Sequence, residues 1–173
     1  MGGVSTDEVR LEAATLQDAE LLSNLLELYI HDLSEAFPDI ELGADGRFGY
    51  RRLPLYWSDP SNRFPFLVKY GQRVVGFALI MRGSLLIDPD AFDVAEFFIL
   101  RRWRRTGLGR RAAHLLWDRL PGRWIVRAAL RNAGAVPFWA RTISEYIGRD
   151  ADELPHPQLP DAWRVFTFQS TPM

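Results

Sequence analysis

The segment with the clearest chemistry is a run of arginines that leads into two closely spaced glycines, Gly107 and Gly109. It follows an apolar run at 95–100 and precedes a stretch whose leucines recur at helical spacing. Glycine lets a backbone approach a ligand closely, and a helix start presents N–H groups with a partial positive charge. The sequence therefore predicts a phosphate-binding loop between a strand and a helix. Its residues are Arg104, Arg105, Thr106, Gly107, Leu108, Gly109 and Arg110.

One acidic residue, Glu96, is set into the apolar run that precedes this loop. Burial disfavours the charged form of a carboxyl group and raises its pKa, which suits such a group to accept a proton near neutral pH. We therefore expect Glu96 to act as a catalytic base, with Asp93 as the second candidate. The sequence leaves open the alternative that Glu96 forms an ion pair with one of the many arginines.

Acidic and basic residues are separated along the chain, although its net charge is only −1. Residues 1–46 contain eleven acids and one base, whereas residues 101–149 contain twelve arginines and two acids. The acidic half should attract cations, and the connector at 43–62 carries aromatic residues that could fold over a ligand or simply pack on the core. We therefore expect a pocket for a cationic amine, with Tyr29, Asp32, Tyr50 and Trp57 as its candidate residues.

The spacing of apolar residues predicts elements in the order β-α-β-β-β-α-β-α-β. A central hairpin followed by β-α-β units indicates an α/β fold of the α+β type, with a mixed, largely antiparallel sheet flanked by helices on both faces. With 173 residues, the chain is expected to form one domain over 1–173. The expected strands lie at 9–12, 64–70, 73–81, 92–100, 124–129 and 163–169, and the expected helices at 15–37, 107–120 and 135–146.

The composition argues against several classes of protein. The chain has no cysteine, which excludes disulfides, thiol catalysis and thiolate metal sites, and we expect no bound metal. No apolar run is long enough to span a membrane, so we expect a cytoplasmic protein without a membrane partner. Arginines interleaved with Trp103 could grip a nucleic acid, but the acidic half opposes that partner. The oligomeric state stays open, a homodimer included.

The stretch from Phe97 to Gly109 resembles the acetyl-CoA-binding motif of the GNAT superfamily of N-acetyltransferases, which reads Q/R-x-x-G-x-G/A between a strand and a helix. Arg104, Gly107 and Gly109 occupy its defining positions. The order of the expected elements agrees with that family, so the resemblance covers nearly the whole chain. The segments DGRFGY and YWSDP are also similar to an uncharacterised bacterial branch of acetyltransferases. A second family element, Asn-x-x-Ala-x-x-Phe followed by an aromatic residue, is matched by Asn132, Ala135, Phe138 and Trp139.

The resemblance implies an N-acetyltransferase that moves an acetyl group from its co-substrate acetyl-CoA to a primary amine of a small molecule or peptide by direct attack. It implies that acetyl-CoA lies where the central strand separates from the next one. The N–H groups of 105–110 would hold the pyrophosphate, and a backbone N–H of Ile99 or Leu100 would bind the oxyanion. The other implied cofactor contacts are the backbone of Phe98, Ile99 and Leu100, together with Asn132 and Phe138.

One position departs from the family pattern. Many members carry at position 139 a tyrosine that protonates the leaving thiolate, and the indole of Trp139 cannot act as an acid. Either Tyr146 takes this role, or the thiolate leaves unaided, which a thiol pKa of about 8.5 makes tolerable. The departure also keeps open a non-catalytic acyl-CoA-binding regulator on the same fold.

Overall fold

A seven-stranded sheet forms the centre of the computed structural model, which describes residues 8–84 and 87–171. The order across the sheet is β1-β2-β3-β4-β5-β7-β6, and all neighbours are antiparallel except β4 and β5, which are parallel. The expected mixed, largely antiparallel sheet is therefore confirmed. The strands are β1 (Val9–Ala13), β2 (Arg63–Tyr70), β3 (Arg73–Ser84), β4 (Asp88–Ile99), β5 (Gly122–Ala129), β6 (Asp152–Pro155) and β7 (Trp163–Ser170).

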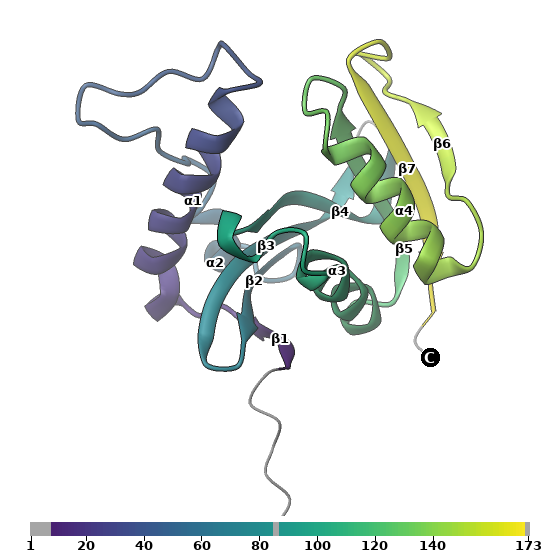
Figure 1. Cartoon of the computed structure of the whole chain (residues 1–173), viewed down its shortest axis with the longest axis horizontal. Helices are drawn as coiled ribbons and strands as arrows, with labels where there is room; N and C mark the ends of the chain where they lie inside the picture. The colour runs from purple at the N-terminus through teal and green to yellow at the C-terminus, as the bar shows by residue number, and fades with distance from the viewer. Residues whose placement is uncertain (1–7, 85–86, 172–173) are drawn as a thin grey trace, which may run out of the picture.

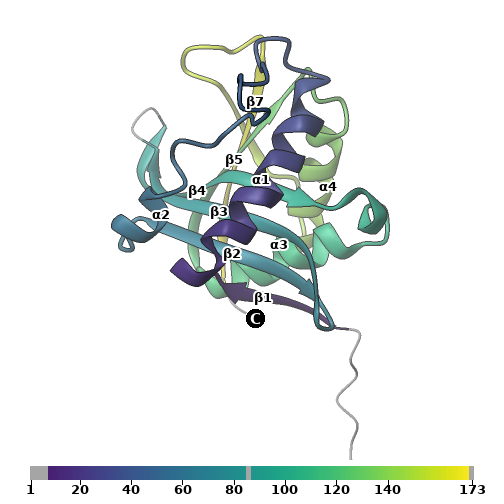
Figure 2. The same cartoon turned by 90° about the vertical axis from the view of Figure 1, so that its left-hand side faces the viewer.

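Helices cover both faces of this sheet, as expected. Figure 2 shows α1 crossing in front of the strands from β1 to β4, with α3 behind them. Two short 3₁₀ turns, Leu16–Asp18 and Arg101–Trp103, precede α1 and α3. Within 8–84 and 87–171, every helix is too short or too polar to cross a membrane. The helices are α1 (Ala19–Ser34) and α2 (Leu55–Ser58) on one face, and α3 (Leu108–Arg119) and α4 (Ala135–Ile147) on the other.

Side-chain alternation along the central strands decides which helix packs on which face. Phe77 and Leu79 of β3 are fully buried in a cluster with the leucines of α1. Ile80 belongs instead to the cluster that contains Trp117 of α3. Because both faces of β3 are covered, this strand is apolar almost throughout, which is why the sequence predicts it well.

Three segments differ from the sequence prediction. β4 begins at Asp88, four residues before the expected strand and within an Asp-Pro-Asp sequence that is typical of a turn. α2 lies within the connector at 43–62, and β6 lies within the acidic, proline-rich segment 150–160, for which the sequence predicts no strand. β6 is exposed along its length and pairs with β7 at the edge of the sheet. No apolar alternation therefore marks it, and Pro155 is tolerated there because an edge strand can spare one N–H group.

β4 and β5 separate soon after they meet. Across the described strands, only Phe92 with Trp124 and Asp93 with Ile125 are paired, although β4 continues to Ile99. Figure 1 shows β5 and β7 turning away from the direction of β3 and β4. The parallel pair therefore leaves part of β4 without a neighbour on its β5 side.

A β-bulge accompanies this separation. Val94 pairs with Ile80 and Glu96 pairs with Leu79, so Ala95 is an extra residue on β4. A bulge bends its strand and re-aims the side chains that follow it. It places Glu96 on the face that α1 covers, at the start of the unpaired part of β4.

Candidate active site

The edge of β4 that faces β5 has no strand partner beyond Asp93 in the described structure. On its other edge, the N–H of Leu100 donates to the carbonyl of Val75 in β3 at 2.9 Å. Because backbone groups alternate along a strand, the N–H and C=O of Ile99 face the open edge. An extended ligand could add there like another strand. The N–H of Leu100 is already used, so Ile99 is the better of the two predicted oxyanion donors.

The backbone between β4 and α3 forms a concave set of N–H groups. Arg105 and Gly107 have positive φ angles of 62° and 83°, and Gly107 is the N-cap of α3. In the described part of the chain, the N–H groups of Arg105, Thr106 and Gly107 donate to no backbone carbonyl, and the first N–H groups of a helix have no partner within it. A Cβ at Gly107 would meet only the end of the Arg110 side chain, at 3.7 Å, so the positive φ is what requires glycine there. This arrangement suits a phosphate group.

Arg104 stabilises this loop through its side-chain hydrogen bonds. Its Nε donates to the carbonyl of Ile99 at 2.7 Å, and its Nη2 donates to Oδ2 of Asp32 on α1. Arg101 binds the other oxygen of Asp32, with 2.7 Å between Nη2 and Oδ1. Asp32 therefore ties α1 to the loop, and its carboxylate is already engaged by two cations, which weakens the expectation that it binds a cationic substrate.

This tie should be measurable as a pH-dependent stability. Burial of Asp32 opposes its ionisation, but hydrogen bonds from Arg101 and Arg104 outweigh this and hold its pKa below the usual value. A lowered pKa stabilises the fold above the unfolded value of about 3.9, and that contribution is lost as the pH falls through the folded value. We expect Asp32→Asn to lower the free energy of unfolding at pH 7 by about 1–3 kcal/mol in urea denaturation. The difference from wild type should shrink on acidification.

The exposed Asp39, in the loop after α1, supplies the matched control. Asp39→Asn removes the same charge and should leave the stability within about 0.5 kcal/mol of wild type. Equal stability of Asp32→Asn and wild type at pH 7 would show that the tie contributes nothing.

Two phenols hold the carboxylate of Glu96. Tyr29 of α1 donates to Oε2 at 2.7 Å, and Tyr50, from the segment before α2, donates to Oε1 at 3.0 Å. Its hydrogen-bond partners are therefore tyrosines from two distant parts of the chain, and not an arginine as the alternative interpretation supposed. Two of the predicted substrate residues thus converge on the predicted base.

Burial is also the main influence on the acid–base properties of this cluster. It raises the pKa of Glu96 above the usual value, while the two phenol hydrogen bonds and the charge of Arg127 oppose the rise. The pKa values of Tyr29 and Tyr50 are raised by burial and by the neighbouring Glu96, so both phenols stay protonated donors. Tyr56 of α2 is 1% exposed, and burial raises its pKa to about 12.

A buried ion pair lies where β4 and β5 part. Asp93 is completely buried, and its Oδ1 accepts hydrogen bonds from Nε and Nη2 of Arg127 on β5, at 3.3 and 3.2 Å. Burial raises the pKa of Asp93, although the charge of Arg127 counteracts the effect. Enclosed and ion-paired, Asp93 is less suited than Glu96 to take a proton from a substrate. Sequence reasoning missed Arg127, although it is the one charged residue in the apolar run 124–129, just as Glu96 is in 95–100.

Tyr146, the predicted general acid, is not brought to Glu96. It lies on α4 and packs against Trp117 of α3, with ring centroids 5.0 Å apart. Its hydroxyl donates to Oδ1 of Asp118 at 2.7 Å, and burial together with that carboxylate raises its pKa. Tyr146 is therefore on the α3–α4 face of the sheet, whereas Glu96 is on the α1 face.

The other predicted residues lie in different parts of the structure. Asn132 lies in the turn after β5, and that turn shares an edge of the sheet with the glycine loop because β4 and β5 are parallel. Phe138 packs beside the loop, and a Cβ at Gly109 would lie 3.4 Å from its ring. Trp57 donates its indole N–H to the carbonyl of Ala14 at 3.3 Å, which fixes α2 on the core. Arg110 bonds to Glu145 on α4 at 2.8 Å.

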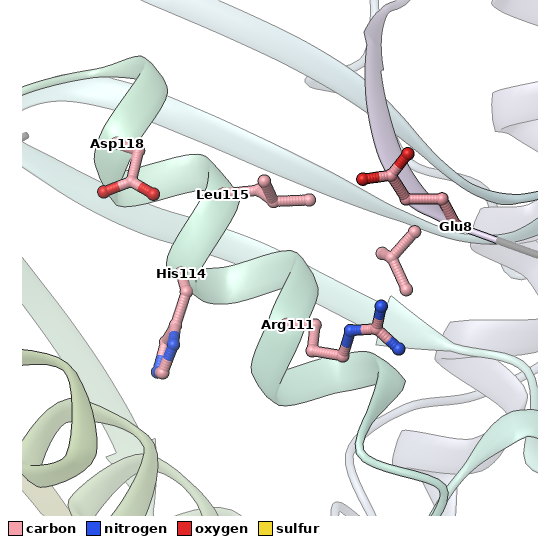
Figure 3. Close-up of a pocket in the computed structure, with 6 residues that line it drawn as sticks. Glu8, Arg111, His114, Leu115 and Asp118 are labelled. Carbon is pink, nitrogen blue, oxygen red and sulfur yellow. The ribbon is translucent and has the colours of Figure 1, made fainter. Parts of the chain in front are cut away.

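A hollow of about 220 Å³ lies elsewhere, between α3 and the start of β1. Figure 3 shows Arg111 and Leu115 of α3 facing Glu8, while His114 and Asp118 turn toward the other side of the helix. His114 bonds there to the carbonyl of Thr142, at 3.0 Å, and Asp118 to Tyr146. The hollow shares no lining residue with the Glu96 cluster or the glycine loop.

Comparison with known families decides what kind of protein carries this site. The model of the acetyltransferase (GNAT) family matches residues 22–143, which include most of α1, the Glu96 cluster, the glycine loop and Asn132. The chain belongs to the acetyltransferase (GNAT) family. The GNAT resemblance drawn from the sequence motifs is thereby confirmed, and the seven-stranded sheet with helices on both faces is the fold of that family. No curated protein matches the sequence.

Solved structures resemble this GNAT chain in fold at low sequence identity. An acetyltransferase from Thermus thermophilus is 20% identical, with a TM-score of 0.65, covering 93% of this chain and 96% of that one. A spermidine N-acetyltransferase from Vibrio cholerae, in complex with CoA and spermine, is 14% identical, with a TM-score of 0.60 and coverages of 94% and 95%. The protein yncA from Salmonella typhimurium, with its cofactor acetyl-CoA, is 12% identical, with a TM-score of 0.62 and 94% of both chains covered. At these identities the likeness establishes the fold.

Proposed function

We propose that this GNAT protein is an N-acetyltransferase that moves the acetyl group of acetyl-CoA to a primary amine of a small molecule or peptide. The proposal rests on the placement of Glu96, whose pKa is raised, on the bulged part of β4 where the strand loses its β5 partner. The structural relatives from Vibrio cholerae and Salmonella typhimurium hold CoA and acetyl-CoA, which supports a ligand of this class.

The chain offers groups that suit each part of acetyl-CoA. The N–H groups from Arg105 to Arg110 suit the pyrophosphate, because an αL-rich loop and a helix start together concentrate N–H donors and positive potential. Backbone groups along the open edge of β4, which has no strand partner beyond Asp93 in the described structure, suit the amides of the pantetheine arm and leave the N–H of Ile99 for the oxyanion. Bound there, acetyl-CoA would supply an acyl carbon activated as a thioester.

Glu96 would take up the proton that the attacking amine loses. The carbon–nitrogen bond forms as the carbon–sulfur bond breaks, and the proton passes through the carboxylate to the solvent or the departing thiolate. The N–H of Ile99 would stabilise the negative charge that develops on the carbonyl oxygen. We propose direct transfer, and the lack of cysteine excludes a thioester intermediate on the protein itself. We propose that the thiolate departs without a tyrosine acid, since the hydroxyl of Tyr146 is held by Asp118.

Removing one phenol from Glu96 should move the pH dependence of this reaction. The hydrogen bond from Tyr50 favours the ionised form of Glu96 and so lowers its pKa. Tyr50→Phe should therefore shift the acidic limb of the kcat/KM profile to higher pH, with the plateau rate less affected than the limb. Tyr70→Phe, in β2, removes a hydroxyl outside the Glu96 cluster and should leave the limb in place. A limb that moves to lower pH in Tyr50→Phe would overturn the assignment of Glu96 as base.

Amine-dependent release of free CoA thiol tests the proposed function. The protein would be incubated with acetyl-CoA and a panel of primary amines, with mass spectrometry of the products. We expect at least one chemical class of amine to gain an acetyl group while thiol is released in equal amount. Binding of acetyl-CoA without acetylation of any amine would instead favour an acyl-CoA-binding regulator. Trp139 is the observation that keeps this second function in view, because it is buried against Phe97 where many relatives carry a catalytic tyrosine.

A further inference from the structure

Arg127 is a second charged group at the opening between β4 and β5. Asp93 pairs with Ile125, and Arg127 lies two residues further along β5, so Asp93 and Arg127 share a face of the sheet. Glu96 occupies the same face, which α1 covers, because its carboxylate bonds to Tyr29. The proposed base and this guanidinium therefore face one region from the two diverging strands.

Asp93 fixes how the guanidinium is presented. Both Nε and Nη2 donate to the single oxygen Oδ1, at 3.3 and 3.2 Å, so one side of the fork is occupied. Within residues 8–84 and 87–171, Nη1 of Arg127 has no hydrogen-bond acceptor. The arginine side chain is 29% exposed, whereas the Asp93 side chain is 0% exposed. A buried carboxylate thus holds an arginine that is itself partly exposed.

The edge of the guanidinium formed by Nη1 and Nη2, opposite the side that Asp93 occupies, has a specific chemical preference. The planar guanidinium presents parallel N–H groups that match the two oxygens of a carboxylate. Burying the carboxylate of Asp93 costs free energy. The Asp93–Arg127 ion pair nevertheless lies at the point where β4 and β5 separate. An arginine held this rigidly loses little conformational entropy on binding an anion.

The other charges near Glu96 point the same way. Arg52 and Arg127 are the charged groups that act on its carboxylate, and both are positive. Two acids of α1, Asp32 and Glu27, are engaged by groups of the protein itself. Asp32 binds Arg101 and Arg104, and Glu27 accepts the N–H groups of Phe48 and Gly49. The arginines close to Glu96 would therefore repel a polyamine. An amine that also bears a negatively charged group would be favoured there.

We infer that the acceptor is an amine that also bears a carboxylate, with the amine directed to Glu96 and the carboxylate bound by Arg127. This inference rests on the proposed N-acetyltransferase function and narrows its acceptor to amino-acid-like zwitterions. Arg127 is then a specificity-determining residue. Asp93 is a positioning residue that acts through the guanidinium.

Matched pairs of amines test the inference. The acceptors would be α-amino acids and ω-amino acids of graded length, each compared with its own amide, which keeps the amine and removes the negative charge. An aminoalkylphosphonate series distinguishes a general anion site from a carboxylate site. We expect wild type to prefer the carboxylate over the amide by about 10- to 100-fold in kcat/KM, since a charged hydrogen bond contributes about that factor. Phosphonates should be poorer than carboxylates.

Variants of the Asp93–Arg127 ion pair show whether this pair causes the preference for carboxylate acceptors. Arg127→Met alone leaves Asp93 buried without its partner, so the double variant Arg127→Met with Asp93→Asn guards against misfolding. In either variant the KM for the carboxylate acceptor should rise by about 10- to 100-fold with a smaller change in kcat. Calorimetry of the acceptor binding to the CoA-saturated protein should show the same loss. Arg123→Met with Asp88→Asn is the matched control, because it removes an ion pair between the same two strands at their paired end.

The possible results distinguish a failure of the acceptor inference from a failure of the proposed function. Acetylation of amides as efficiently as carboxylates, or a carboxylate preference that survives in the double variant, would overturn the inference and leave the N-acetyltransferase proposal standing. Weaker acetyl-CoA binding by the double variant would also overturn it, since Arg127 would then serve the co-substrate. Failure of every amine to react would count against the proposed function, and failure of carboxylate amines to bind the CoA-saturated protein would count against the acceptor class.

Discussion

Replacing Glu96 by glutamine is expected to lower kcat/KM for amine acetylation by about 10²–10⁴-fold, the usual contribution of a general base. Glutamine keeps the shape of the side chain and can still accept hydrogen bonds from Tyr29 and Tyr50, but it cannot take up a proton. The affinity for acetyl-CoA should be nearly unchanged, because the proposed cofactor contacts are backbone groups of the neighbouring loop and strand. Initial rates from thiol release and calorimetry with acetyl-CoA would separate the two effects.

The stability of the same variant provides a check on folding. Burial raises the pKa of Glu96 in the folded protein, so this group stabilises the fold while protonated, and that contribution is lost as the pH rises through the folded value. Ionised Glu96 therefore costs stability at neutral pH, and Glu96→Gln should have an equal or higher Tm there. Glu20→Gln, at an exposed position in the first turn of α1, should leave both rate and Tm unchanged. Full activity in Glu96→Gln would exclude the residue as base.

Replacing Gly107 by glutamate should abolish the rise in Tm that acetyl-CoA gives the wild-type protein and weaken its binding by about 10²-fold or more. Two features combine here: glutamate would have to adopt a φ angle of +83°, and its carboxylate would add negative charge where the N–H groups converge. Loss of one or two charge-assisted hydrogen bonds, each contributing about 1.5–3 kcal/mol, accounts for a change of this size. Calorimetry and thermal shifts with acetyl-CoA would measure it.

Gly148→Glu is a control that separates the effect of backbone strain from the effect of losing the phosphate-binding loop. Gly148 ends α4 with a φ of +72°, and a Cβ there would meet nothing within 4 Å. Glutamate at 148 therefore imposes a similar backbone strain and the same charge outside the loop. It should lower Tm about as much as Gly107→Glu and retain acetyl-CoA binding. Equal binding in both variants would place the phosphate site somewhere other than the glycine loop.

The sequence predicted those parts of the site that are local. The glycine loop is contiguous, so two glycines before an amphipathic stretch suffice to predict N–H groups at a helix start, and Gly107 does cap α3. Glu96 is detectable because a lone acid in an apolar strand is unusual. The separation of β4 from β5 followed from the resemblance to the GNAT superfamily, whose central strands are known to part.

The partners of these residues could not be read from the sequence. Tyr29 and Tyr50 lie 67 and 46 positions from Glu96, and only the packing of α1 and of the connector on the sheet brings them to one carboxylate. The engagement of Asp32 by the arginines is equally remote, since the partners are 69 and 72 positions apart. Charge counts along the chain therefore suggested a cationic acceptor, whereas the structure shows that this acid is engaged.

The bulge at Ala95 and the strand β6 were unpredictable for a different reason. The bulge inverts the alternation of the β4 residues that follow it, but β4 contributes apolar side chains to the clusters on both faces, so its apolar pattern looks the same with or without the extra residue. β6 is exposed and short, so its place is set by hydrogen bonds to β7 and leaves no apolar signal. Both features depend on backbone pairing, which single residue types scarcely encode.

The location of the acetyl-CoA site is the central claim, and backbone amide NMR tests it most directly. Titration of the ¹⁵N-labelled protein with acetyl-CoA should shift the amide signals of 105–110 and of Ile99 first and most. Signals from the hollow between α3 and β1, such as those of Glu8 and Leu115, should move little. Shifts confined to that hollow, or no shifts with acetyl-CoA in excess, would contradict the account.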